Sequence, residues 1–157
     1  MRVPVPLIAL VLGLPAVALA AETLSCPDLG GARQVAACPT EAELRYTFVG
    51  YCSDNARMYD RGAEACDDFA KYRKLKNVAL WESADGTFAG YASCDLAPEA
   101  IRAARAAGIA VERKGTLTRL VCDYAGGIRF VHRTRATCTV QGSGACDTPG
   151  DCRASCQ

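Results

Sequence analysis

Cysteine is the residue type in this chain that offers the most chemistry, but its spacing argues against redox catalysis. A thioredoxin-type site needs two cysteines with two residues between them, so that one thiolate is activated beside its resolving partner. The closest approach to that spacing is Cys152 and Cys156, with three residues between them. Haem attachment needs the tighter spacing and a following histidine, so it is excluded for the same reason.

The cysteines are therefore expected to be structural. They are Cys26, Cys38, Cys52, Cys66, Cys94, Cys122, Cys138, Cys146, Cys152 and Cys156. The last four offer the ligand number of a zinc site, but an oxidising compartment favours two disulfides instead. We predict a disulfide framework whose pairing the sequence leaves open, with no metal and no cofactor.

His132 is the only histidine, so any imidazole chemistry depends on it. The strand pairing expected below places it on the core side, where a lone histidine is usually a hydrogen-bonded core residue. No serine or cysteine motif of a nucleophile and its base accompanies it. The neighbouring Asp67 and Asp68 point in different directions on a helix and suit its N-terminal dipole better than a glycosidase pair. We predict no catalytic residue and keep a hydrolase that uses His132 as an alternative.

Basic residues are frequent in the C-terminal half and offer the most specific prediction of a binding site. The candidates are Arg113, Lys114, Arg119, Arg129, Arg133 and Arg135. Guanidinium groups bind carboxylates in a bidentate manner, so such a face would suit an anionic protein surface. The alternative is a solvated face that discourages edge aggregation. Aromatic anchors for an interface are also available, although at strand spacing they are more often core: Tyr46, Tyr51, Trp81 and Tyr91.

The overall charge argues against nucleic acid as the partner. The chain has 18 basic and 17 acidic residues, so it lacks the strong positive excess of a nucleic-acid-binding protein. The distribution is uneven, because acids predominate between Glu41 and Asp68 and bases between Glu99 and Arg135. This asymmetry can orient a protein partner.

The N-terminus has the three zones of a secretory signal. Arg2 supplies a positive charge, the run from Val3 to Val17 is apolar, and Ala18-Leu19-Ala20 offers small residues for cleavage after Ala20. A membrane anchor is disfavoured because the apolar run is shorter than a membrane span and is interrupted by prolines. A lipoprotein is disfavoured because Cys26 does not directly follow this run. We predict a signal peptide at 1–20, a domain at 21–141 and a cysteine-rich tail at 142–157. An even number of cysteines then indicates a periplasmic or secreted protein with no membrane span after cleavage.

Local patterns predict an α+β fold. Strands are expected at 44–51, 77–83, 87–94, 109–112 and 117–124, and from 128 to 140; helices are expected at 63–74 and 95–107. Asp85-Gly86 lies between two of the strands and is a strong hairpin signal. We expect an antiparallel sheet of four to six strands, with the two helices against one face, held by disulfides, and a loop-like tail.

The register of the last hairpin can be predicted from its alternation. A three-residue loop at 125–127 places Leu120 opposite His132 and Cys122 opposite Phe130 on one face. Arg119 then lies opposite Arg133, Val121 opposite Val131 and Asp123 opposite Arg129 on the other face. A two-residue loop would mix apolar and charged side chains on both faces.

Taken together, these features favour an exported binding module over an enzyme. We expect an inhibitor or an accessory subunit of an envelope complex that binds another protein through the basic hairpin face. The alternative to binding a macromolecule is a periplasmic protein that binds a small molecule in a cleft between the helices and the sheet.

The mass of the exported protein tests the processing and the redox state. It should begin at Ala21 and be lighter than the reduced chain by about ten hydrogens, because five disulfides remove two each. Two or more alkylatable thiols in the native and the denatured protein would contradict a fully bridged framework.

Overall fold

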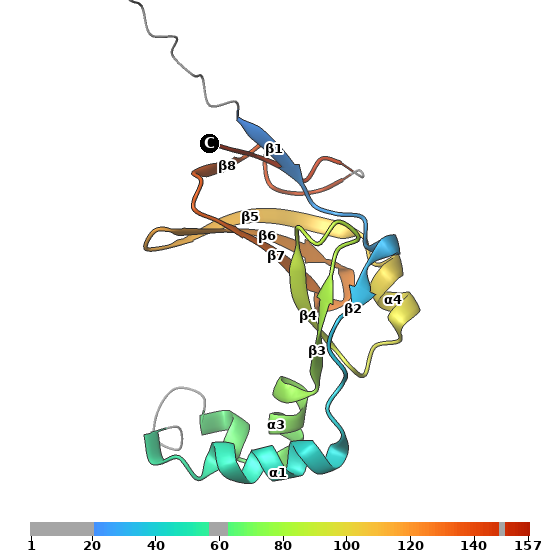
Figure 1. Cartoon of the computed structure of the whole chain (residues 1–157), viewed down its shortest axis with the longest axis vertical. Helices are drawn as coiled ribbons and strands as arrows, with labels where there is room; N and C mark the ends of the chain where they lie inside the picture. The colour runs from blue at the N-terminus through green and yellow to red at the C-terminus, as the bar shows by residue number, and fades with distance from the viewer. Residues whose placement is uncertain (1–20, 57–62, 148–149) are drawn as a thin grey trace, which may run out of the picture.

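The computed structural model describes residues 21–56, 63–147 and 150–157, and the predicted signal segment at 1–20 lies outside them. The described chain is α+β, with two antiparallel sheets (Figure 1). The strands are β1 (Glu22–Ser25), β2 (Arg33–Gln34), β3 (Val78–Glu82), β4 (Ala89–Ser93), β5 (Ala106–Lys114), β6 (Leu117–Tyr124), β7 (Arg129–Thr134), β8 (Cys138–Val140) and β9 (Arg153–Cys156). The helices are α1 (Glu41–Cys52), α3 (Phe69–Lys76) and α4 (Pro98–Ala103), and the 3-10 turns are η1 (Leu29–Gly31), η2 (Ala63–Cys66) and η3 (Ala125–Gly127).

The larger sheet has six strands in the order β2-β3-β4-β7-β6-β5. It confirms the predicted antiparallel sheet and the predicted Asp85-Gly86 hairpin, in which β3 pairs with β4. The register predicted for β6 and β7 is also confirmed, since Cys122 pairs with Phe130 and Val121 with Val131. Gly126 and Gly127 in the connecting turn have φ values of 77° and 74°, a conformation that favours glycine.

The smaller sheet, in the order β1-β9-β8, was not predicted. Its central strand β9 comes from the tail that was expected to be loop-like, so that prediction is wrong for Arg153–Cys156. The alternation of buried Ala154 and Cys156 with less buried neighbours is a strand pattern, but four residues are too few to stand out beside the glycines and cysteines around them.

The strand predicted at 44–51 is wrong, because these residues belong to helix α1. A capping box starts the helix: Glu43 N–H donates to the Thr40 hydroxyl, and Thr40 N–H donates to the Glu43 carboxylate. Aromatic and β-branched residues suggested a strand, yet Phe48 has the spacing of a helix face and its ring lies 5.2 Å from that of Tyr72 in α3. Local capping outweighs the composition here.

Both predicted helices are shorter than expected. Asp68 accepts a hydrogen bond from Lys71 N–H and starts α3 there, so the residues before it form only the turn η2. The helix predicted to run to residue 107 ends at Ala103, because the chain pairs with β6 from Ala106 onward. Only α4 packs on the sheet, through the buried Ile101, whereas α1 and α3 pack on each other in a separate helical lobe (Figure 1).

The core lies on one face of the six-stranded sheet, which we call the inner face. Leu120, Cys122 and Phe130 are fully buried there. Leu29 of η1 and Ala154 of the small sheet, together with α4, belong to the same cluster and cover this face. The opposite, outer face has no such layer among the described residues, which is why its side chains are the first place to seek a binding site.

Five disulfides pair all ten cysteines, as predicted: Cys26–Cys122, Cys38–Cys94, Cys52–Cys66, Cys138–Cys156 and Cys146–Cys152. The bridge between Cys26 and Cys122 spans 96 residues and joins the N-terminal segment to the inner face. Long closed loops gain the most from such a constraint on the unfolded chain.

The helical lobe is held to the sheet by a bridge and an ion-pair network. Cys38–Cys94 crosses the junction, and the Arg73 guanidinium donates two hydrogen bonds, of 2.9 and 3.0 Å, to the carboxylate of Asp95. These hydrogen bonds lower the pKa of Asp95. Arg73 also contacts Glu41 of α1 at 3.3 Å, so one side chain links three elements of the chain.

A pair of glycine substitutions tests how the sheet is joined. A Cβ atom at Gly90 of β4 would overlap the carbonyl oxygen of Arg129 in β7, whereas one at Gly50 of α1 would meet nothing within 4 Å. We expect Gly90→Ala to lower the free energy of unfolding by about 3 kcal/mol, and Gly50→Ala to raise it by about 0.5–1 kcal/mol. Urea unfolding measures both. A neutral Gly90→Ala variant would contradict the close contact between β4 and β7.

Candidate outer-face binding site

Three rows of cross-strand neighbours on the outer face contain the candidate residues. The row on the side of the helical lobe contains Val35, Leu80 and Tyr91; the next row contains Ala89, Val131, Val121 and Ala110; the third row contains Arg133, Arg119 and Glu112. Side chains alternate between faces along a strand, so each row follows from the register. The pair between Ala89 and Val131 joins the two halves of the sheet.

The structure brings most of the predicted basic residues to this face, but not all of them. Arg119, Arg129 and Arg133 lie on it, and Lys114 joins them through its pairing with Leu117. Arg135 follows β7 directly, beyond Thr134. Arg113 pairs with Thr118, and alternation places that pair on the inner side of the hairpin. The predicted set is therefore split between two sides of the sheet.

Two of these arginines are already paired with acids on the same face. Arg119 contacts Glu112 at 3.1 Å, and Arg129 contacts Asp123 at 2.6 Å. The hydrogen bond to Asp123 raises the pKa of Arg129. In the part of the chain that the structure describes, no ion pair is formed by three of the exposed cations: Lys114, Arg133 and Arg135. They carry free positive charge at the side of this face formed by β5, β6 and β7.

Arg119 contributes to packing as well as to charge. Its Nε atom is buried and has no hydrogen-bond partner among the described residues, so the stem of this side chain lies against the sheet. The neighbouring Val121 is only 1% exposed and Val131 only 7%, although both lie on the outer face. Long arginine stems can shield apolar neighbours in this way. The outer face is therefore not simply a solvated surface.

Tyr91 is one of the aromatic residues named above as available anchors, although their strand spacing more often indicates core. It is 65% exposed, whereas Trp81 on the opposite face of the neighbouring strand is 2% exposed. The sequence does contain the signal: Phe88, Gly90 and Ala92 alternate with Tyr91 and are buried, so Tyr91 must face the other way. Leu80 pairs with Tyr91, and Val35 N–H donates to the carbonyl of Leu80. The three form an apolar row.

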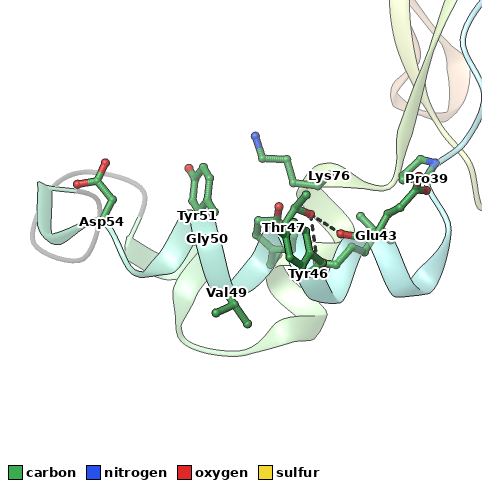
Figure 2. Close-up of a pocket in the computed structure, with 11 residues that line it drawn as sticks. Pro39, Glu43, Tyr46, Thr47, Val49, Gly50, Tyr51, Asp54 and Lys76 are labelled. Carbon is green, nitrogen blue, oxygen red and sulfur yellow. Dashed lines mark hydrogen bonds between the residues drawn. The ribbon is translucent and has the colours of Figure 1, made fainter.

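The helical lobe offers a second surface, an open groove of about 890 Å³ along α1 (Figure 2). Tyr46 and Val49 beside it are 83% and 68% exposed. Its charged groups are already engaged: the Glu43 carboxylate caps the helix, and Lys76 Nζ lies 4.9 Å from the centre of the Tyr51 ring. The groove is apolar but has no charge pattern that selects a ligand.

A smaller cavity of about 370 Å³ lies between the start of β5 and the Cys146–Cys152 loop. Arg105, Asp28 and Tyr124 are among its lining residues. The Tyr124 hydroxyl donates to the Pro27 carbonyl at 2.7 Å, and burial raises the pKa of this tyrosine. This cavity has a size typical of ligand pockets and is where the small-molecule alternative would apply.

His132 makes a structural hydrogen bond. Its Nδ1 atom lies 2.9 Å from the carbonyl oxygen of Thr87, and because a carbonyl can only accept, Nδ1 carries the proton. Its ring packs 5.6 Å from that of Phe88. The imidazole thus ties β7 to the segment before β4.

The described residues contain neither a cluster of metal ligands nor a helix that could span a membrane. Within 21–56, 63–147 and 150–157, no three or more His, Cys, Asp or Glu side chains are grouped so as to hold a metal ion. None of the helices in these ranges has the length and apolarity to cross a membrane.

Charge reversals at two facing arginines test the role of Arg119. Arg119→Glu would place a carboxylate opposite Glu112 and remove the stem beside Val121, so we expect a loss of about 1–3 kcal/mol in the free energy of unfolding. Arg133→Glu would face Arg119 and should change stability by no more than about 0.5 kcal/mol. Thermal unfolding compares them. Equal effects would mean that the Arg119 stem does not shield the sheet.

No protein-family model, curated protein or solved structure matches this chain. Its five disulfides fit an exported protein. Function must therefore be inferred from the surfaces of the chain itself.

Proposed function

We propose that this chain is an exported, disulfide-stapled protein that binds another macromolecule through the outer face of its six-stranded sheet. The partner is an envelope or extracellular protein with an anionic surface, and the chain acts as its inhibitor or as an accessory subunit. The compartment is the periplasm or the extracellular space, where disulfides form and persist.

The observation that carries the proposal is the position of the free cations. Arg133 and Lys114 are exposed on a face that no second layer covers among the described residues, while the main core cluster lies on the inner face. A guanidinium that has no ion pair in its own chain can bind a carboxylate of a partner in a bidentate manner. Complementary charge of this kind speeds association and fixes orientation.

The paired arginines suit a partner with carboxylates better than they suit a polyanion of uniform charge. Glu112 and Asp123 lie beside the arginines and would repel a dense row of phosphates, whereas a protein surface can place its own cations opposite them. A protein surface of mixed charge with an acidic excess fits this arrangement.

Capture from an envelope extract, followed by mass spectrometry, would identify the partner. Binding should then weaken by at least about tenfold in Arg133→Glu, because reversal replaces an attraction on the order of 1 kcal/mol by a repulsion. Added salt should weaken wild-type binding as well, since exposed charges are screened over about 8–10 Å.

Arg113→Glu is the matched control, because it makes the same charge change in β5 of the same sheet, on the opposite side. It should bind within about twofold of wild type if the outer face is the site. An equal loss in both variants would indicate attraction to net charge alone. Unchanged binding by Arg133→Glu, with the fold intact, would place the interface elsewhere and contradict the proposal.

A further inference from the structure

The apolar row on the outer face is contiguous with the arginines. Tyr91 lies two residues beyond Ala89 on β4, and Arg129 lies two residues beyond Val131 on β7, in the same direction from the Ala89–Val131 pair. Alternation keeps all four side chains on the outer face. Gly90 makes this continuity possible, since its missing side chain lets β4 meet the backbone of Arg129.

The row exposes more apolar surface than sheet packing needs. Tyr91 is 65% and Val35 is 44% exposed, and Leu80 between them is partly exposed. Aromatic side chains with low conformational entropy, adjacent to arginines, are the residues that dominate binding energy at protein interfaces. On this surface, Tyr91 has the side-chain type and the position of such an anchor.

Charge around the row favours an acidic partner. Arg33 lies on β2 in the neighbouring row, opposite Glu82, and forms no ion pair with any described residue. Arg129 flanks the row on the other side. Two arginines thus border the apolar row at its two ends, of which Arg33 has no ion pair within the described chain and Arg129 contacts Asp123 through its Nε atom. Among the described residues, the groove along α1 is lined by one cation, Lys76.

We propose that Val35, Leu80 and Tyr91 anchor the partner by receiving an apolar side chain from a protein segment that carries carboxylates on either side of it. This inference rests on the proposed function and specifies its partner: a segment in which acidic residues flank a large apolar residue. Carboxylates would reach the bordering arginines while the apolar side chain contacts the row.

Two capped synthetic peptides test this inference on the mature, oxidised protein. One alternates glutamate with leucine and phenylalanine, and the other has serine in place of every apolar residue. Calorimetry should show that the apolar peptide binds about tenfold more tightly, as expected for one well-placed anchor. Nuclear magnetic resonance with labelled protein should place its shift changes at Val35, Leu80 and Tyr91.

Tyr91→Ala should abolish the difference in affinity between the two peptides, and Tyr46→Ala is the matched control. Tyr46 is a similarly exposed tyrosine on α1, so its removal should leave the tenfold ratio unchanged. Arg133→Glu should lower the affinity for both peptides by the same factor. This variant therefore tests the proposed function separately from the apolar anchor. Thermal unfolding confirms that each variant is folded.

Several results would overturn the inference. If the tenfold ratio of peptide affinities persists in Tyr91→Ala, or if the shift changes are confined to α1, the apolar row is not the anchor. Binding by the basic face would still stand. Binding of polygalacturonate that depends on Tyr91, with neither peptide bound, would assign the row to an acidic glycan instead. Affinities that do not respond to Arg133→Glu would count against the proposed function itself.

Discussion

The close contact between β4 and β7 is the constraint on which the rest of the structure depends. Gly90 lets the two backbones meet where any side chain would strike the Arg129 carbonyl. That contact joins the β2-β3-β4 arm to the β7-β6-β5 unit and makes one six-stranded sheet. It brings Phe88 against His132 on the inner face, and on the outer face it makes the apolar row continuous with the arginines. Without this junction the six-stranded sheet would divide into two three-stranded sheets with no extended face.

A covering layer on only one face of the six-stranded sheet explains the need for disulfides. A sheet that packs its core on one side leaves apolar residues on the other, and here Val121 is kept from water beside the Arg119 stem rather than under a second layer. Five bridges add stability that such a one-sided core lacks, each by roughly 2–4 kcal/mol. The arginines therefore have two roles, since the same side chains that shield the sheet also give its surface a positive charge.

The sequence predicted those parts of the fold in which neighbouring strands interact through regular alternation. The register from Leu120 to His132 followed from matching apolar and charged faces, and it placed Arg119 and Arg133 correctly. The prediction failed where helix capping decided the local structure. Thr40 and Glu43 start a helix whose residues have the composition typical of a strand. The outer-face position of Tyr91 was within reach of the same alternation, but its aromatic character favoured the core. The small sheet depends on contacts between the two ends of the chain, which no local pattern reveals.

Binding by the outer face is the central claim, and hydroxyl-radical footprinting of side chains tests it most directly. The captured partner should protect Tyr91 and Leu80 from oxidation, while Tyr46, an exposed tyrosine in the same molecule, serves as the internal reference. We predict strong protection of Tyr91 and unchanged oxidation of Tyr46. Protection of Tyr46 with full reactivity at Tyr91 would place the partner on the helical lobe and contradict binding by the sheet.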